Sequence, residues 1–118
     1  MNAVRQKLPL LVKTELAAAN SQHPPFASIH EAYAVMLEEF EETREELEIL
    51  DQLMRKTWLA VRYDDKMEAD VLQLIEQTAV SAAAEAIQLA AMARKAMPLV
   101  KCETRIPRWQ REEAAKYE

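Results

Sequence analysis

The chain has 118 residues, half of them hydrophobic and none of them glycine, and its formal net charge is −5. This length predicts one domain with a real core, and the lack of glycine excludes the Gly-rich phosphate loops of P-loop and Rossmann proteins. The net acidity argues against nucleic-acid binding. A single cysteine, no leader and no apolar run of ~20 residues predict a cytoplasmic protein without a membrane partner.

The first half of the chain predicts two helices. Alanine, leucine, glutamate and glutamine dominate while β-branched and aromatic residues are sparse, so we expect an all-α protein. A first helix is expected over residues 3–19, or from Pro9 if this proline takes the first helical position, and it ends before the Pro24-Pro25 pair. Ser28 with Glu31 three residues later forms a capping box, which predicts a second helix that continues to Tyr63.

The second half predicts one further long helix and a tail. Asp64 or Asp65 is expected to cap a helix from about Lys66 to Met97, divided or bent near Ser81 and ending before Pro98. We expect a helical bundle domain over residues 1–98 and a C-terminal extension over residues 99–118. The extension is rich in basic residues, Pro107 starts a short helix in it, and its thiol, Cys102, is expected to be idle.

The two long helices are expected to need partners. Each is about 45 to 50 Å long at 1.5 Å per residue, whereas a compact domain of this size has a radius of gyration of ~13 to 14 Å. A homodimer or homotetramer would cover the exposed helix faces. The alternative is a second helix that breaks and folds back within one chain.

One stripe of the second helix combines apolar residues with carboxylates at spacings of 4, 3, 4, 3 and 4: Val35, Glu39, Glu42, Glu46, Ile49 and Leu53. A neighbouring stripe is the more conventional core face: Met36, Phe40, Thr43, Leu47, Leu50, Met54, Thr57 and Val61. Carboxylates that border a core must be protonated, paired or bound to a cation. The competing interpretation is a solvated acidic face, which fits the glutamates outside the stripe, Glu38, Glu41, Glu45 and Glu48.

The third helix carries a matching stripe that a single glutamate interrupts: Val71, Ile75, Thr78, Ala82, Glu85, Leu89, Met92 and Ala96. Glu39 and Glu42 can point at one cation, Glu85 arrives from the facing helix, and Gln88 lies on the same side as Glu85. Such oxygen ligands suit Mg²⁺ or Mn²⁺, which bridge to phosphate oxygens. The pattern therefore predicts a metal site for phosphate chemistry.

Residues 28–42 (SIHEAYAVMLEEFEE) and 85–93 (EAIQLAAMA) resemble the two metal-binding helices of the MazG-like nucleotide pyrophosphohydrolases, in particular short phage-type members. The resemblance implies an oligomeric helical bundle that binds Mg²⁺ and hydrolyses a nucleoside triphosphate to the monophosphate and pyrophosphate. It implies metal ligands at Glu39, Glu42, Glu85 and Gln88, and a catalytic base at Glu38 or Glu46. This chain departs from the family pattern in two respects. Gln88 stands where an aspartate is usual, and more residues separate Glu42 from Glu85 in the sequence than in most family members.

The sequence does not single out the residues that contact the substrate, and it is also compatible with two other functions. Five basic residues are available for phosphate groups: Arg55, Lys56, Arg62, Arg94 and Lys95. Trp58 or Tyr33 can stack on a base, although aromatic residues at helical spacing are more often members of the core. The first rival function is a non-catalytic helical oligomer, such as a phage or prophage accessory protein that has kept the fold without the aspartate. The second is an adaptor whose acidic helix attracts a basic partner.

Overall fold

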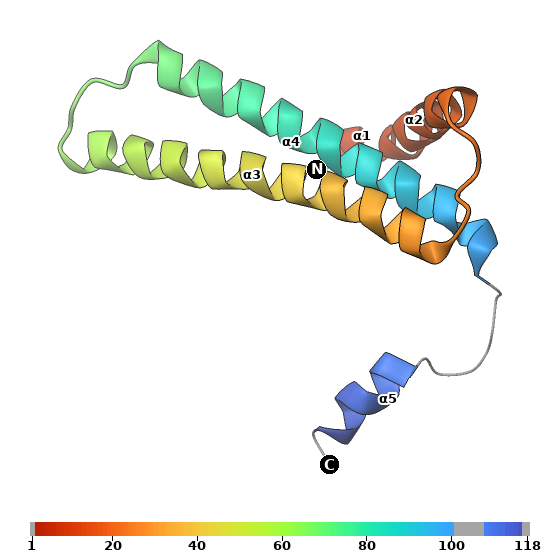
Figure 1. Ribbon diagram of the computed structural model, residues 1–118. Helices are drawn as coiled ribbons and strands as arrows, with labels where there is room; N and C mark the ends of the chain where they lie inside the picture. Colours follow the sequence, from red (N-terminus) through yellow and green to blue (C-terminus); the bar gives the residue numbers. More distant parts are fainter. Residues whose placement is uncertain (1, 101–107, 117–118) are drawn as a thin grey trace.

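The computed structural model describes residues 2–100 and 108–116, in which every regular element is a helix and no strand occurs. This confirms the all-α prediction for the described residues. The elements are α1 (Asn2–Arg5), α2 (Leu8–Gln22), α3 (Ile29–Arg62), α4 (Ala69–Ala96), the 3₁₀ helix η1 (Met97–Leu99) and α5 (Arg108–Ala115). Helices α3 and α4 form a long antiparallel hairpin, α2 packs on α4 near one end of it, and α5 stands apart (Figure 1). None of these helices is long and apolar enough to span a bilayer.

The N-terminal helix is divided close to the alternative start at Pro9, because α2 begins at Leu8, and it extends beyond its predicted end. A turn at residues 6–7 separates α1 from α2, because Pro9 has no N–H to donate to the carbonyl of Arg5. Helix α2 then continues to Gln22, three residues beyond the predicted end. It ends there because His23 precedes a proline and adopts an extended conformation, with φ of −134° and ψ of 145°.

The start of α3 is as predicted, and its end explains an incorrect expectation. The Glu31 N–H donates to Ser28 Oγ, and the Ala27 N–H donates to Glu31 Oε2, both at 3.2 Å. At the other end Asp64 has a left-handed φ of 51°, and the Asp65 N–H donates to the carbonyl of Ala60 at 2.9 Å. This is the Schellman pattern, in which glycine is the usual left-handed residue. Asp64 and Asp65 therefore end α3, and the prediction that either caps the next helix is wrong.

Helix α4 presents the predicted stripe to the rest of the molecule. It begins after Glu68 and runs without interruption to Ala96, so it is not divided near Ser81. Five members of the stripe are buried and the other three, Ile75, Glu85 and Leu89, are half-buried. Small side chains such as Ala82 allow a neighbouring helix to approach closely.

The core occupies only one end of the hairpin. It contains Phe26, Ala32, Ala91, Met92 and Ala96, with Val12, Leu16 and Ala19 of α2 packed against them. Beyond this region α3 and α4 have only each other, and the expected core face of α3 is half covered. One column of it is half-buried, Met36, Thr43, Leu50 and Thr57, whereas the other is exposed, Phe40, Leu47, Met54 and Val61. The radius of gyration is 19.3 Å, well above that of a compact domain.

The structure describes only part of the predicted C-terminal extension. Helix α5 begins at Arg108, close to the expected start. Pro107 and Cys102 lie outside the described residues.

Candidate metal centre

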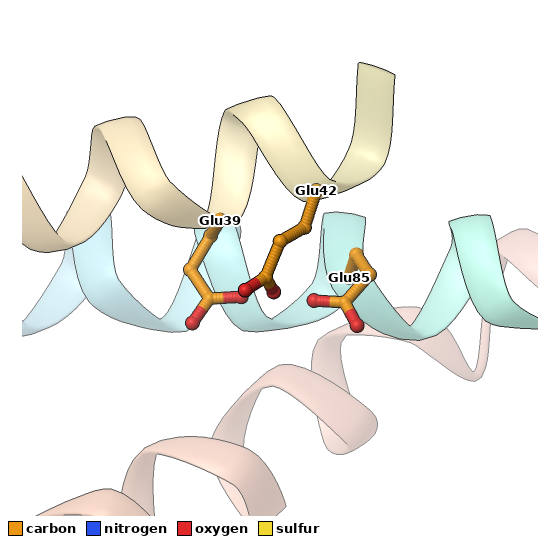
Figure 2. Close-up of side chains that lie close together, drawn as sticks. All are labelled: Glu39, Glu42 and Glu85. Atoms are coloured by element: carbon orange, nitrogen blue, oxygen red, sulfur yellow. The ribbon is translucent and has the colours of Figure 1, made fainter. Parts of the chain in front are cut away.

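Three glutamates from two helices converge beside the core. Glu39 and Glu42 lie one turn apart on α3, and Glu85 points toward them from α4 (Figure 2). One carboxylate oxygen from each residue lies within 4.8 Å of the other two, and all three side chains are half-buried. These residues are termed the acidic cluster. The acidic cluster contains three of the four residues that were predicted as metal ligands, and the fourth, Gln88, lies beside it.

Apolar packing on both helices fixes the position of the cluster. Val35, one turn before Glu39, packs against the core, and Met92, two turns after Glu85, is part of it. Ala82, three residues before Glu85, is buried and offers little bulk between the helices. Because the flanking turns are held by these contacts, the backbone positions of the three glutamates are largely determined before any ligand binds.

Gln88 contacts two members of the cluster. We assign its amide nitrogen to the side that faces the carboxylates, where it donates to Glu39 Oε2 at 2.8 Å and to Glu85 Oε2 at 3.0 Å. The opposite orientation would set the amide oxygen against two carboxylate oxygens, which is unfavourable without a cation between them. Gln88 can therefore donate hydrogen bonds to the cluster or, after its amide turns over, offer it a fourth oxygen ligand.

The carboxyl groups of the cluster have raised pKa values. Partial burial is the largest cause for Glu39 and Glu85, whereas for Glu42 it is the hydrogen bond with Glu85. The negative charge of neighbouring glutamates raises the pKa of all three further. These three carboxyl groups therefore lose their protons at a higher pH than isolated glutamates, or exchange them for a cation.

Further glutamates surround the cluster, and one of them was missed by the sequence reasoning. The charges of Glu38 and Glu15 raise the pKa of Glu39, and that of Glu46 raises the pKa of Glu85. Glu38 is exposed and Glu46 is half-buried, so both predicted bases lie beside the cluster. Glu15 comes from α2, whose packing against α4 brings it near, and no spacing within the sequence relates it to Glu39.

Positive charge gathers at the core end of the hairpin. Arg94, Lys95 and His23 line a cavity of about 290 Å³, and Lys95 also lines a neighbouring cavity of about 250 Å³. The Lys95 Nζ lies 4.7 Å from the centroid of the Phe26 ring. Lys95 follows Glu85 by ten residues, or roughly 15 Å along α4. A ligand that extends from the cluster toward the core end would approach this charge.

The other basic candidates for substrate contacts lie at a distance from these cavities. Arg55, Lys56 and Arg62 are on the half of α3 beyond the core, where Arg55 pairs with Asp51 at 3.1 Å. Trp58 and Tyr33 are both 60% exposed, so neither belongs to the core of the described chain.

The donor set of the cluster fits a hard divalent cation. Three carboxylates and one amide supply only oxygen ligands, which Mg²⁺ and Mn²⁺ prefer. Ligands 2.0–2.1 Å from an octahedral Mg²⁺ lie about 2.9 to 4.2 Å apart. The separations of up to 4.8 Å in the cluster reach that range by modest rotations of the glutamate side chains.

Comparisons with family models, curated proteins and solved structures returned no match for this chain. The resemblance to the MazG-like proteins therefore stays an expectation, and function has to be inferred from the geometry of the site.

Proposed function

We propose that the protein is a Mg²⁺- or Mn²⁺-dependent hydrolase that converts a nucleoside triphosphate to the monophosphate and pyrophosphate. The observation that carries this proposal is the convergence of Glu39, Glu42 and Glu85 from two helices. Within residues 2–100 and 108–116 no basic side chain forms an ion pair with these carboxylates. The negative charge of the cluster therefore favours a cation from solution, and the resemblance supplies the type of reaction.

The residues around the cluster divide the work. Glu39, Glu42 and Glu85 hold the cation, and the Gln88 amide turns its oxygen toward it. A divalent cation at this position neutralises phosphate charge and lowers the pKa of water. Glu46 or Glu38 accepts the proton of the attacking water, since both lie beside the cluster.

Basic residues at the core end of the hairpin can neutralise the phosphate groups of the substrate that extend beyond the cation. Lys95 and Arg94 line the cavities at the core end and attract anionic groups that extend beyond the cluster. The Phe26 ring beneath Lys95 limits the side-chain positions open to the ammonium group. This arrangement leaves acidic residues to bind the cation and basic residues to bind the phosphates.

The proposal is tested by measuring Mg²⁺ binding calorimetrically and pyrophosphate release for a panel of nucleoside triphosphates. Glu39→Gln and Glu85→Gln are expected to weaken cation binding and to reduce turnover by about 100-fold or more. The matched controls are Glu41→Gln and Glu48→Gln, which remove the same charge from exposed positions. Equal losses in all four variants would instead support an acidic adaptor surface. Tight Mg²⁺ binding without turnover of any nucleotide would reject the hydrolase and keep the metal site.

A second candidate function follows from the hydrogen bonds of Gln88. Its amide satisfies one oxygen of Glu39 and one of Glu85, so the cluster can exist in a helical protein that has no cation and no catalytic role. In that case the chain is a non-catalytic helical oligomer, and Mg²⁺ binds neither to the wild type nor to the variants. Folded protein without a calorimetric signal would decide for this function.

We also propose that the working protein contains more than one copy of the chain, as a homodimer or homotetramer. The observation in favour is the half of the α3–α4 hairpin that lies beyond α2. There the buried residues are Val71, Thr78 and Ala82, and two helices alone enclose little apolar surface.

A further inference from the structure

Five large side chains form an exposed stripe along α3, and they recur every seven residues: Tyr33, Phe40, Leu47, Met54 and Val61. They are between 45% and 62% exposed and are termed the outer stripe. The stripe spans 29 residues, and its ends lie about 42 Å apart along the helix. On a straight helix a seven-residue repeat drifts by about 20° per heptad, so the five members stay on one side of α3, in the pattern typical of a helix that packs against another helix. A parallel row with the same seven-residue spacing is half-buried: Met36, Thr43, Leu50 and Thr57. The outer stripe is therefore the uncovered part of a helix-packing surface.

The exposed area of the chain is large enough for a stable dimer. The accessible surface is 9968 Å², which exceeds by roughly 3,400 Å² the ~6,500 Å² that is typical of a compact monomer of this mass. Helix α5, exposed along its length, accounts for a part of the excess. Obligate dimers bury about 1,000 to 2,500 Å² on each copy. The excess is larger than the area that such a dimer buries on each copy, and α5 accounts for part of the difference.

The outer stripe is symmetric about its central residue. Phe40 and Met54 each lie seven residues from Leu47, and Tyr33 and Val61 each lie fourteen residues from it. A two-fold axis at Leu47, with the two α3 helices antiparallel, pairs Leu47 with its own copy and Phe40 with Met54 of the second copy. Methionine sulfur and aromatic rings make favourable contacts. A two-fold interface requires a self-complementary surface of this kind.

The charge of α3 selects the antiparallel arrangement. Residues 29–48 contain eight glutamates and one arginine, whereas residues 49–62 contain one aspartate, two arginines and one lysine. Parallel helices would place the two acidic halves side by side. Antiparallel helices place the acidic half of each copy beside the basic half of the other, which lowers the electrostatic energy relative to a parallel pair.

We infer that a second copy of the chain covers the outer stripe, in a two-fold dimer whose α3 helices run antiparallel and cross near Leu47. The inference rests on the proposal of a multi-copy protein and is independent of the cation and the nucleotide. It identifies the interface and its symmetry, which the length of the helices alone leaves open.

The first test is the mass of the full chain in solution, measured by light scattering and sedimentation at tens of micromolar. The wild type is expected to be a dimer, or a tetramer built from such dimers, and Leu47→Glu is expected to lose this interface. The matched control is Val80→Glu, which adds the same charge at a 64% exposed position on α4 and should keep the wild-type mass. Circular dichroism checks that each variant stays helical. A monomeric wild type would overturn both the multi-copy proposal and this inference.

Cysteine cross-linking then tests the symmetry, in a background with Cys102→Ser that removes the only native thiol. Leu47→Cys is expected to form disulfide-linked dimers on mild oxidation. Phe40→Cys alone should not, but mixed with Met54→Cys it should give the mixed dimer. Self-linking of Phe40→Cys would indicate parallel helices and overturn the symmetry. An assembly that keeps its mass with Leu47→Glu and gives no Leu47 cross-link would place the interface elsewhere, while leaving the multi-copy proposal standing.

Discussion

Replacing Glu85 with glutamine is expected to change the stability of the protein in opposite directions with and without a divalent cation. Without a cation, the substitution removes a charge that lies within 4.8 Å of a carboxylate oxygen of Glu39. Two unit charges at this distance repel by about 0.9 kcal/mol at the dielectric constant of water. Because screening weakens exposed pairs, we expect a gain of about 0.5 kcal/mol, or a few degrees in Tm at this chain length.

The gain should depend on pH with a definite sign. The pKa values of Glu39, Glu42 and Glu85 are raised above 4.5 in the folded protein, so around and above this pH the folded state binds more protons than the unfolded chain. The stability that these groups contribute is therefore fully present below about pH 4.5 and is lost as the pH rises through the raised values. In EDTA, the advantage of Glu85→Gln should vanish below about pH 4 and be largest near pH 7.

With Mg²⁺ present the order of stability should reverse. A cation at 100 times its dissociation constant stabilises the folded wild type by about 2.7 kcal/mol, which exceeds the relief of repulsion in the variant. The assay is thermal unfolding followed by circular dichroism in EDTA and in Mg²⁺, at constant protein concentration. Glu48→Gln, at an exposed position on the same helix, serves as the control and should show no reversal. A Glu85→Gln variant that is less stable than the wild type in EDTA would refute the repulsion, and a wild type insensitive to Mg²⁺ would refute cation binding.

Three other substitutions test separate features. Gln88→Asp supplies a carboxylate in place of the amide and is expected to tighten Mg²⁺ binding about tenfold in calorimetry; weaker binding would mean that the Gln88 side chain does not reach the ion. Lys95→Ala should raise KM for the nucleotide more than it lowers kcat, and an unchanged KM would separate the basic cavities from the substrate. Asp64→Gly should stabilise the protein by about 0.5 to 1 kcal/mol in denaturant unfolding, because glycine adopts a left-handed φ without steric strain; destabilisation would contradict this account of the α3 terminus.

The features that repeat along one helix were the most predictable from the sequence. The eight-residue stripe of α4 is buried or half-buried as expected, and the capping contacts of Ser28 and Glu31 start α3 at the expected residue. The convergence of Glu39, Glu42 and Glu85 follows from the same periodicity. When the stripes of α3 and α4 pack together, the glutamates that interrupt their apolar residues lie at the same height along the hairpin.

The features that depend on contacts between distant segments were less predictable. Asp64 takes the left-handed position that glycine usually occupies, and its side chain gave a misleading signal for a helix start. The second stripe of α3 was expected to be core throughout, but only the turns that face α4 are covered, which leaves Leu47 exposed. The hydrogen bonds of Gln88 to two helices require the three-dimensional arrangement of both, and so does the approach of Glu15 from α2.

The position of Glu15 links the docking of α2 to the charge of the cluster. Helix α2 packs against the core through only three aliphatic side chains, Val12, Leu16 and Ala19. The same packing places Glu15 near Glu39. Each proton or cation that the cluster gains lowers the repulsion that α2 must overcome to stay docked. Local opening of α2 should therefore be more frequent at neutral pH in EDTA than at acid pH or with Mg²⁺. Amide hydrogen exchange along α2 would then report the charge of a site formed by two other helices.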